Sequence, residues 1–269
     1  MQLQGKTAVL TGAGSGIGRA IAISLAQRGC HLALADINEA GLADTAKLLP
    51  GNVRVSRHLL DVSDRNAVKA LPGQVIAEHG GADILINNAG VAVGGTFADI
   101  SEVDFDWLIG INYWGVVYMT RAFLPLLNKG QEAWIANVSS IYGIIAPPSQ
   151  TAYASSKFAV RGFTHALRHE LKDTNIGVTV IHPGGVATQI VNSARIQTNL
   201  PPEEIAARRA FANRNLKMPP AQAGEIIVSG IANGKARIFV GRDAKFMSIV
   251  ERIAPVSYWD FLSRLIARS

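Results

Sequence analysis

Cysteine is almost absent from this 269-residue sequence, whose single example is Cys30. No disulfide can form within the chain, a cysteine-rich metal cluster is excluded, and we expect Cys30 to be a small core residue. No run of about 18 apolar residues occurs, so no membrane-spanning helix is expected. The first residues, MQLQGKTAVLT, run directly into an apolar segment, so no secretory signal peptide is expected either. These absences predict a cytoplasmic protein without a metal site.

Charge is also sparse, at 17% of residues, and it is unevenly placed. Residues 1–200 carry 15 Lys and Arg against 14 Asp and Glu, whereas residues 201–269 carry 11 against 6. No zinc-finger spacing and no dense Lys/Arg run is present, so we do not expect a nucleic-acid partner. The basic C-terminal part is compatible with binding to an anionic partner or an anionic membrane surface.

No internal repeat, low-complexity linker or domain boundary interrupts the chain. Short apolar runs instead alternate with helical patterns, which predicts a single α/β domain, 1–269, with a doubly wound parallel sheet of about seven strands and helices on both faces. The predicted strands are Lys6–Thr11, His31–Ala35, Val53–Leu60, Asp83–Ile86, Trp134–Val138, Gly177–Ile181 and Ala236–Val240.

A cluster of glycines, TGAGSGIG at Thr11–Gly18, lies between the first strand and a helical pattern. In this context glycines let the backbone approach a pyrophosphate, and the helix N-terminus offers free N–H groups. The spacing of Gly12, Gly16 and Gly18 departs from the strict GxGxxG fingerprint. We interpret the segment as a phosphate-binding loop of a dinucleotide site.

Asp36 ends the second strand, twenty positions after Gly16. A carboxylate there would accept hydrogen bonds from the adenosine ribose and repel a 2′-phosphate, and its neighbour Ile37 supplies no compensating positive charge. The sequence therefore favours NAD over NADP. The alternative is that Asp36 serves as the N-cap of the helix that follows.

The later strand ends carry small and polar residues, where backbone and ligand would meet: Asp61-Val62, Asn87–Gly90 and His182–Thr188. A helix capped by Ser63 or Asp64 should run to about His79. Ser101–Asp104 resembles a capping box for a long helix through Leu127. Asn112 lies in the middle of that helix, where an asparagine usually needs a local reason. Further helices are predicted at Pro202–Asn213 and Gln222–Asn233.

Tyr153 and Lys157 are four positions apart in a helical pattern, and Ser140 lies thirteen residues upstream of the tyrosine. The spacing places both side chains on one helix face. An ammonium beside a phenol should lower the tyrosine pKa from roughly 10, which would make Tyr153 a general acid/base. Ser140 would donate a hydrogen bond to the substrate oxygen whose proton Tyr153 exchanges. Taken alone, the Tyr-x-x-x-Lys pair is more typical of a solvated helix face.

Together, over about Lys6–Gly241, these motifs resemble the short-chain dehydrogenase/reductase family in its compact single-domain branch. The family's TGxxxGxG is matched by Thr11–Gly18, its NNAG by Asn87–Gly90, and its PGxVxT by Pro183–Thr188. The resemblance implies a Rossmann-type fold, an NAD cofactor and hydride transfer. The cofactor-binding residues that it implies are Thr11, Gly12, Gly14, Ser15, Gly16, Ile17, Gly18, Asp36, Ile37, Asp61, Val62, Asn88, Ala89, Gly90, Tyr153, Lys157, Pro183, Gly184, Val186 and Thr188.

The resemblance also assigns the catalytic roles. Tyr153 would exchange the proton of the substrate oxygen, and Lys157 would lower its pKa and bind the nicotinamide ribose. Ser140, in preference to Ser139, would polarise that oxygen. Asn112 would distort its helix and hold a water that links Lys157 to solvent. The family further implies a homodimer or homotetramer through the helices around Asn112 and Lys157.

The substrate is expected to be apolar, such as a steroid, retinoid, fatty or aromatic alcohol, because the loops that should line the pocket carry little charge. The expected pocket residues are Val93, Tyr142, Pro147 and Ile190, with 189–218 as a covering segment. These side chains would otherwise simply pack their loops. Two other functions stay open: a 3-oxoacyl carrier-protein reductase, against which Asp36 argues, and a catalytically silent NAD-binding regulator.

The C-terminal extension, 242–269, continues beyond the motifs with two apolar stripes broken by Pro255. One contains Phe246, Ile249, Val250 and Ile253, and the other Trp259, Leu262, Leu265 and Ile266, interspersed with Arg242, Lys245, Arg252, Arg264 and Arg268. Packing of a helix pair on the fold is the expected outcome. Weak contact with an anionic membrane is the alternative.

Overall fold

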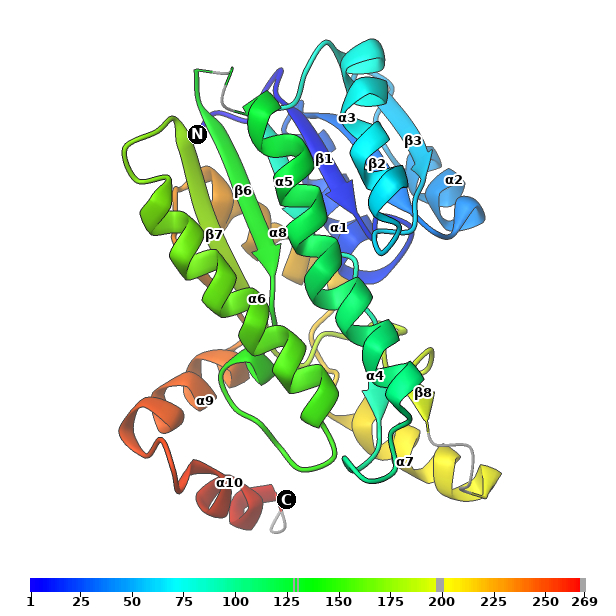
Figure 1. Cartoon of the computed structure of the whole chain (residues 1–269), viewed down its shortest axis with the longest axis vertical. Coiled ribbons are helices and arrows are strands. Elements are labelled where there is room, and N and C mark those ends of the chain that lie inside the picture. The colour runs from blue at the N-terminus through cyan, green and yellow to red at the C-terminus, as the bar shows by residue number, and fades with distance from the viewer. Residues whose placement is uncertain (128, 130, 197–200, 267–269) are drawn as a thin grey trace.

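The computed structural model describes residues 1–127, 129, 131–196 and 201–266. Its centre is a seven-stranded, all-parallel sheet with the order β3-β2-β1-β4-β6-β7-β9 (Figure 1). The strands are β1 (Thr7–Thr11), β2 (His31–Asp36), β3 (Val55–Leu59), β4 (Ile84–Asn87), β6 (Ala133–Val138), β7 (Ile176–Pro183) and β9 (Arg237–Val240). The predicted doubly wound sheet is confirmed, and each predicted strand overlaps an observed one.

The position of a strand in the sheet explains its pattern of buried and exposed residues. All five residues of β1 are buried, because helices cover both faces of a central parallel strand. The strand β3 lies at the sheet edge, and its residues instead alternate between buried Ser56 and His58 and exposed Arg57 and Leu59. The sheet therefore buries its apolar runs in the middle and leaves the alternating pattern to its edge.

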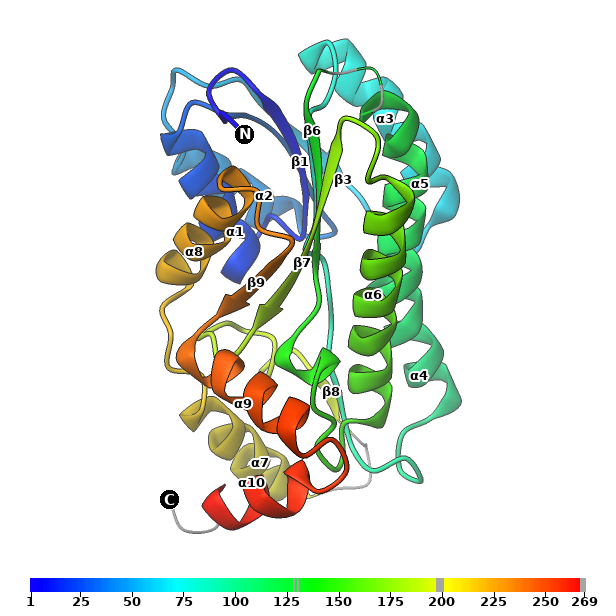
Figure 2. The ribbon, with the colours of Figure 1, turned by 90° about the vertical axis from the view of Figure 1, so that its left-hand side faces the viewer.

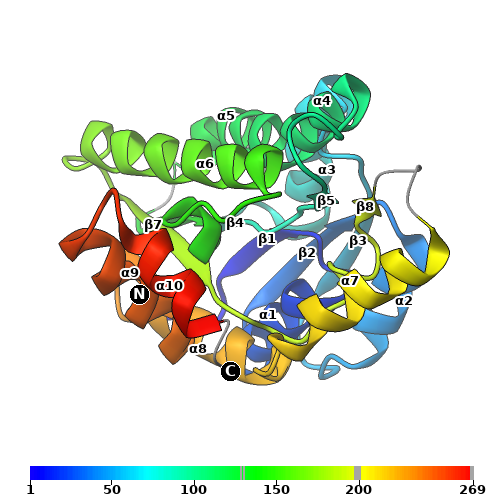
Figure 3. The same ribbon diagram turned by 90° about the horizontal axis from the view of Figure 1, so that it is seen from below.

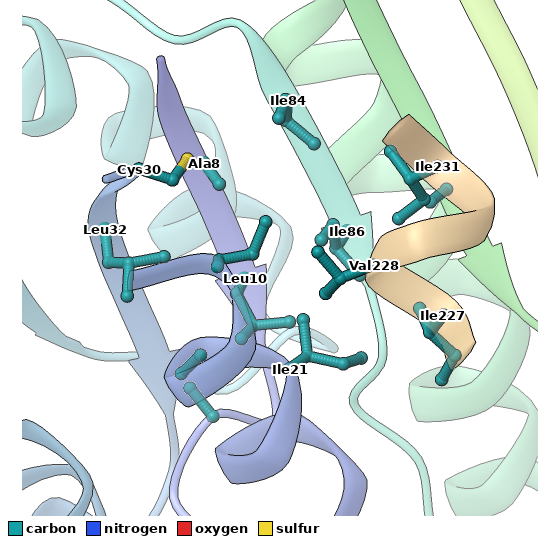
Figure 4. Packing of buried hydrophobic residues seen from close by; sticks show 14 of the residues in the cluster. Ala8, Leu10, Ile21, Cys30, Leu32, Ile84, Ile86, Ile227, Val228 and Ile231 are labelled. Atoms are coloured by element: carbon teal, nitrogen blue, oxygen red, sulfur yellow. The ribbon is translucent and has the colours of Figure 1, made fainter. Parts of the chain in front are cut away.

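The first face of the sheet is covered by α1 (Gly16–Gln27), α2 (Glu39–Lys47) and α8 (Pro220–Ala232) (Figure 2). Buried side chains of α1 and α8 interdigitate with those of β1, β2 and β4 (Figure 4). Cys30 is part of this cluster, with no exposed surface, and burial raises the pKa of its thiol to about 12. Its predicted role as a small core residue is confirmed.

The second face is covered by α3 (Arg65–His79), α5 (Gly115–Leu127) and α6 (Thr151–Glu170), which pack over a second apolar cluster (Figure 2). Asp64 caps α3, as one of the two predicted caps. Asn38, and not Asp36, caps α2 by accepting a hydrogen bond from the N–H of Gly41 at 3.0 Å. The capping interpretation of Asp36 was therefore wrong, because the chain extends two residues further before the helix begins.

The predicted long helix from Ser101 to Leu127 is interrupted. The structure has α4 (Glu102–Ile109), capped by Ser101, then a π-helical turn at Gly110–Trp114, then α5. Asn112 lies in the π-helical turn, so the local distortion expected around this residue is observed.

The helices α7 (Pro202–Arg214), α9 (Arg242–Ile253) and α10 (Tyr258–Ile266) gather beyond the carboxyl ends of the strands (Figures 1 and 3). Beside them, β5 (Val93–Gly94) pairs with β8 (Arg195–Ile196) in parallel. The predicted covering segment, 189–218, thus contributes one short strand, β8, to a second sheet.

The C-terminal extension packs on the fold with one side. Ala244 and Leu262 are buried in a cluster with Ile141, Ile144 and Ile145, from the turn that follows β6. Phe246, Ile249 and Ile253 remain 48%, 50% and 78% exposed on the other side. The side chains of Arg264, Leu265, Ile266 and Arg268 lie outside the described part of the chain. Among the described residues, no helix is both long and apolar enough to span a membrane.

Candidate active site

The glycine loop between β1 and α1 is packed too closely for side chains. A Cβ on Gly12, whose φ is +66°, would meet the backbone of Ala89 and the amide of Asn88 at 2.8 Å. Asn88 in turn donates to the carbonyl oxygens of Thr11 and Gly12, at 3.0 and 3.1 Å. The NNAG segment after β4 therefore holds the glycine loop against the carboxyl end of the sheet.

The N-terminus of α1 opens into this site. Ser15 occupies the N-cap position without making a side-chain capping bond to described residues, and the first turn contains no acidic side chain. The first N–H groups of the helix and its positive dipole end thus remain available to an anion. Thr188, from the loop after β7, lies opposite: a Cβ on Gly16 would come within 3.2 Å of its methyl group. These residues suit a pyrophosphate between α1 and Thr188.

Asp36 stands at the outer side of the glycine loop. Its carboxylate accepts hydrogen bonds from the N–H groups of Gly14, at 2.8 Å, and Asn38, at 2.9 Å. A carboxylate oxygen has lone pairs beyond the one used, so Asp36 retains acceptors for ribose hydroxyls. Ile37 beside it is 69% exposed and uncharged.

Arg19 is a residue of this region that the sequence reasoning missed. Its guanidinium donates to the carbonyl of Gly14 at 2.6 Å and to the hydroxyl of Thr45 at 3.0 Å, so it ties the glycine loop to α2. The sequence did show an arginine three residues after Gly16. Only the folded structure shows that the Gly14 carbonyl of the loop accepts a hydrogen bond from it.

Two further residues converge on Gly90. A Cβ on Gly90 would lie 3.3 Å from both the Asn112 Oδ1 and the Lys157 Nζ. Asn112 accepts a hydrogen bond from the N–H of Val91 at 2.8 Å and donates to the Val91 carbonyl at 3.0 Å. It also donates to the hydroxyl of Ser156 at 3.1 Å. Asn112 thus joins the loop after β4 to α6.

The hydroxyls of the two adjacent serines after β6 have different hydrogen-bond partners. The Ser139 hydroxyl donates to the carbonyl of Lys157 at 2.8 Å and is buried against α6. The Ser140 hydroxyl accepts from the N–H of Tyr142 at 3.1 Å and also hydrogen-bonds Tyr153. Ser140 is therefore the serine that the structure brings to the tyrosine.

Tyr153 and Lys157 project from one face of α6, as the spacing predicted. The Lys157 Nζ lies 5.6 Å from the centroid of the Tyr153 ring and donates to the carbonyl of Val138 at 3.2 Å. Burial lowers the pKa of Lys157 to about 8. Tyr142 packs edge-on against Tyr153, with ring centroids 6.1 Å apart.

The predicted fall in the pKa of Tyr153 is wrong for this structure. Burial raises that pKa to about 12, the hydrogen bond with Ser140 opposes the rise, and Tyr142 adds to it. The physical reason is that loss of solvent around the phenol outweighs the favourable interactions that a phenolate would gain here.

The expected pocket residues divide into two groups. Tyr142, Pro147 and Ile190 are partly accessible, whereas Val93 is buried with Leu108 and Ala152 in a cluster against which Tyr153 packs. Ile144 and Ile145, from the same loop as Tyr142, are only 1% exposed and pack against the C-terminal extension.

The covering segment is anchored at both ends. Lys217 and Met218 donate backbone hydrogen bonds to the carbonyl of Gly185, each at 3.0 Å. Near the other end, the Arg195 guanidinium stacks 3.6 Å above the Trp107 ring and pairs with Asp104 at 2.8 Å. Arg195 was not predicted, since its partners on α4 lie about 90 residues earlier in the chain.

Comparisons with known proteins agree with this geometry. A family model described as short chain dehydrogenase matches residues 6–199. SadH of Mycobacterium tuberculosis, named as an oxidoreductase, is 39% identical over 269 residues that cover 98% of this chain and 96% of that protein. The 3-oxoacyl-[acyl-carrier-protein] reductase FabG of Thermotoga maritima is 37% identical over 191 residues, which are 70% of this chain and 77% of FabG. A short chain dehydrogenase/reductase from Burkholderia phymatum, solved in complex with NAD, superposes with a TM-score of 0.85 at 31% identity, covering 94% of each chain.

Proposed function

The chain belongs to the short-chain dehydrogenase family, and from this premise we propose that it transfers a hydride between NAD(H) and a secondary alcohol or ketone on an apolar substrate. The observation that carries the proposal is the cluster of Ser140, Tyr153 and Lys157, in which Ser140 and Lys157 both lie next to Tyr153 and Lys157 also reaches Gly90. This cluster lies at the carboxyl end of the sheet, where open α/β sheets bind their ligands.

NAD is the proposed cofactor because the residues present suit it. The glycine loop and the N-terminus of α1 would hold the pyrophosphate, and Asp36 the adenosine ribose. Thr188, Pro183, Gly184 and Val186 would line the nicotinamide end, and Asp61 and Val62 the adenine. The carboxylate of Asp36 next to the uncharged Ile37 disfavours a 2′-phosphate. The NAD complex of the Burkholderia relative supports the same choice.

The chemistry divides between cofactor and protein. When bound, the nicotinamide supplies the hydride acceptor in oxidation or the donor in reduction. Tyr153 exchanges the proton with the substrate oxygen through its hydroxyl, and Ser140 donates a hydrogen bond to that same oxygen. Lys157, beside the Tyr153 ring, would hold the nicotinamide ribose of the bound cofactor. Asn112 supports Lys157 by fixing the loop at Val91 and α6 at Ser156, and the water link from Lys157 to solvent remains part of the proposal.

The apolar substrate class rests on the partly accessible side chains of the expected pocket loops. Tyr142, Pro147 and Ile190 are partly accessible. Tyr142 packs against Tyr153, and Ile190 belongs to the covering segment itself. Such surface, with the few polar anchors of the catalytic cluster, suits a steroid, retinoid, fatty or aromatic alcohol better than a sugar. We propose the whole of 1–269 as one domain, with 189–218 covering the substrate.

We further propose a homodimer or homotetramer. Trp114 and Phe158, on the helices around Asn112 and Lys157, are 45% and 39% exposed. Large apolar side chains on a helix surface favour contact with a second copy. Light scattering after gel filtration measures the mass, and a monomer at micromolar concentration would contradict this part.

A 3-oxoacyl carrier-protein reductase is the second candidate, favoured by the similarity to FabG of Thermotoga maritima. Such reductases are expected to use NADPH, and the Asp36 carboxylate disfavours binding of the NADPH 2′-phosphate. Oxidation of NADPH by a 3-oxoacyl thioester, faster than any NAD-dependent reaction, would favour this candidate. Binding of NAD without any turnover would favour a silent regulator.

The deciding experiment measures NADH formation with a panel of secondary alcohols, steroids, retinol and long-chain alcohols. Turnover with at least one apolar alcohol supports the proposal. The matched control is Tyr153→Phe, which should bind NAD nearly as well but turn over roughly 10²–10⁴-fold more slowly, because the proton acceptor is removed. Equal turnover by this variant would remove Tyr153 from the mechanism.

A further inference from the structure

His182, the residue before Pro183 at the end of β7, is a fully buried polar side chain to which the proposed mechanism gives no role. Its Nδ1 lies 2.9 Å from the backbone carbonyl oxygen of Ser140. A carbonyl oxygen only accepts hydrogen bonds, so the imidazole must donate from an Nδ1–H. His182 is thus bonded directly to the main chain of the serine in the catalytic cluster.

The imidazole is held in a single place. His182 is the cross-strand partner of Phe239 on β9, and the two rings are stacked with centroids 5.7 Å apart. Arg237 lies over the other ring of this pair, with its guanidinium carbon 4.8 Å from the Phe239 centroid. The His182 ring is therefore fixed between β9 and the turn that carries Ser140.

Burial, together with the positive charges that face this ring, keeps the imidazole neutral. Burial lowers the pKa of His182 to about 3, the hydrogen bond to Ser140 opposes this, and Arg237, Arg161 and His165 lower it further. A neutral imidazole with its proton on Nδ1 is a fixed hydrogen-bond donor across the working range of an enzyme.

Ser140 needs such a donor because it lies just past the end of a strand. The Ser139 N–H still donates to the carbonyl of Ile181 at 2.8 Å. Pro183 has no N–H with which to continue the ladder from β7. Beyond this ladder, the main-chain carbonyl of Ser140 is bonded by the side chain of His182.

We propose that His182 is a positioning residue, whose Nδ1–H fixes the Ser140 backbone so that the Ser140 hydroxyl meets Tyr153 and the substrate oxygen together. This inference rests on the proposed function, because it acts through Ser140. A displacement of about 1 Å in a catalytic group is enough to slow a reaction substantially. Removing the donor should therefore slow turnover and leave NAD binding intact.

The test compares two amide variants that differ only in where they place their N–H. In His182→Asn the amide nitrogen takes the place of Nδ1 and should still reach the Ser140 carbonyl. In His182→Gln it takes the place of Nε2 and should not. We expect kcat to fall roughly 10-fold or more in His182→Gln and to stay within about 3-fold of wild type in His182→Asn, with the dissociation constant for NAD unchanged in both.

A role limited to packing would lower the melting temperature of both variants and change kcat equally, and equal kcat values in the two would overturn the proposal. A double-mutant cycle with Ser140→Ala adds a second readout that does not depend on the Asn variant. The effect of His182→Gln on kcat should largely disappear in the Ser140→Ala background, because the two residues act as a unit. Full additivity would also refute the positioning role.

Failure of the proposed function and failure of the positioning role of His182 give different results. If the wild-type chain oxidises no alcohol of the panel, the proposed function fails and the role of His182 fails with it. If the wild type is active and the two amide variants behave alike, only the role of His182 fails.

Discussion

Asp243, the second residue of α9, accepts a hydrogen bond from the backbone N–H of Gly185 at 2.7 Å. A side chain on Gly184 would collide with this carboxylate, so the glycine allows the close approach. The C-terminal extension is therefore bonded to the loop after β7, which carries Pro183, Gly184 and Thr188 of the proposed cofactor site.

Replacing Asp243 should weaken this loop. Asp243→Ala removes the acceptor of the Gly185 N–H, at a cost of about 1 kcal/mol, which corresponds to a fall of about 2–4 °C in melting temperature for a chain of this size. The dissociation constant for NAD should rise, as measured by fluorescence titration. Asp243→Asn keeps an acceptor and should retain most of the affinity. Arg242→Ala, at an exposed neighbouring position, is the control, and equal affinities in all four proteins would contradict the prediction.

The pH dependence of stability should report the burial of Lys157. Its pKa is about 8 in the folded chain, against roughly 10.4 in the unfolded chain. Between these values the unfolded chain binds more protons, so the free energy of unfolding should rise from pH 8 to 10 and be lost again as the pH falls. The raised pKa of Tyr153, about 12, acts only above roughly pH 10.

Urea denaturation of the cofactor-free protein at a series of pH values measures this effect. Lys157→Met should gain stability relative to wild type at pH 7.5 and lose that advantage towards pH 10, because it has no ammonium to bury. Lys69→Met, at an exposed position of α3, serves as the matched control. Parallel pH profiles for wild type and Lys157→Met would show that the lysine is not desolvated as described.

Cofactor choice should depend on Asp36 and Ile37. Wild type should bind NAD more tightly than NADP in a fluorescence titration, since the Asp36 carboxylate repels a 2′-phosphate. Asp36→Ala combined with Ile37→Arg should move the preference towards NADP, and Ile37→Ala alone should not. Tighter binding of NADP by the unmodified chain would overturn the assignment.

The extension should contribute to stability through its inner side only. Leu262 is 2% exposed and packs with Ile144 and Ile145, so Leu262→Ala should cost about 2–5 kcal/mol. Its neighbour Phe261 is 50% exposed, and Phe261→Ala should change stability much less. Thermal unfolding compares the two variants. A large loss for Phe261→Ala, or co-sedimentation of wild type with anionic vesicles at physiological salt, would instead indicate that the outer side has a partner.

Much of the fold was readable in the sequence because the parallel sheet is covered on both faces. Continuous apolar runs marked the central strands, and the predicted bounds differ from those of β1, β2 and β4 by only one residue at either end. The small sheet of β5 and β8 was missed, since a strand of two residues has no periodicity to detect. Asp36 was wrongly considered as a cap for α2 because Asp and Asn are both good N-caps, and only the backbone geometry selects Asn38.

The sequence by itself determined which groups are proposed to bind the cofactor and do the chemistry, because the identity and spacing of side chains are properties of the chain. They are the glycine loop, Asp36, Ser140, and the i,i+4 pair of Tyr153 and Lys157. The tertiary structure decided what depends on depth and on distant neighbours. The pKa of Tyr153 is raised and not lowered, because spacing along a helix specifies a face but not its solvation. Likewise, the fold determines that Leu262 is buried, that Phe246 is exposed and that the His182 imidazole meets the Ser140 carbonyl, since long-range packing brings these groups together.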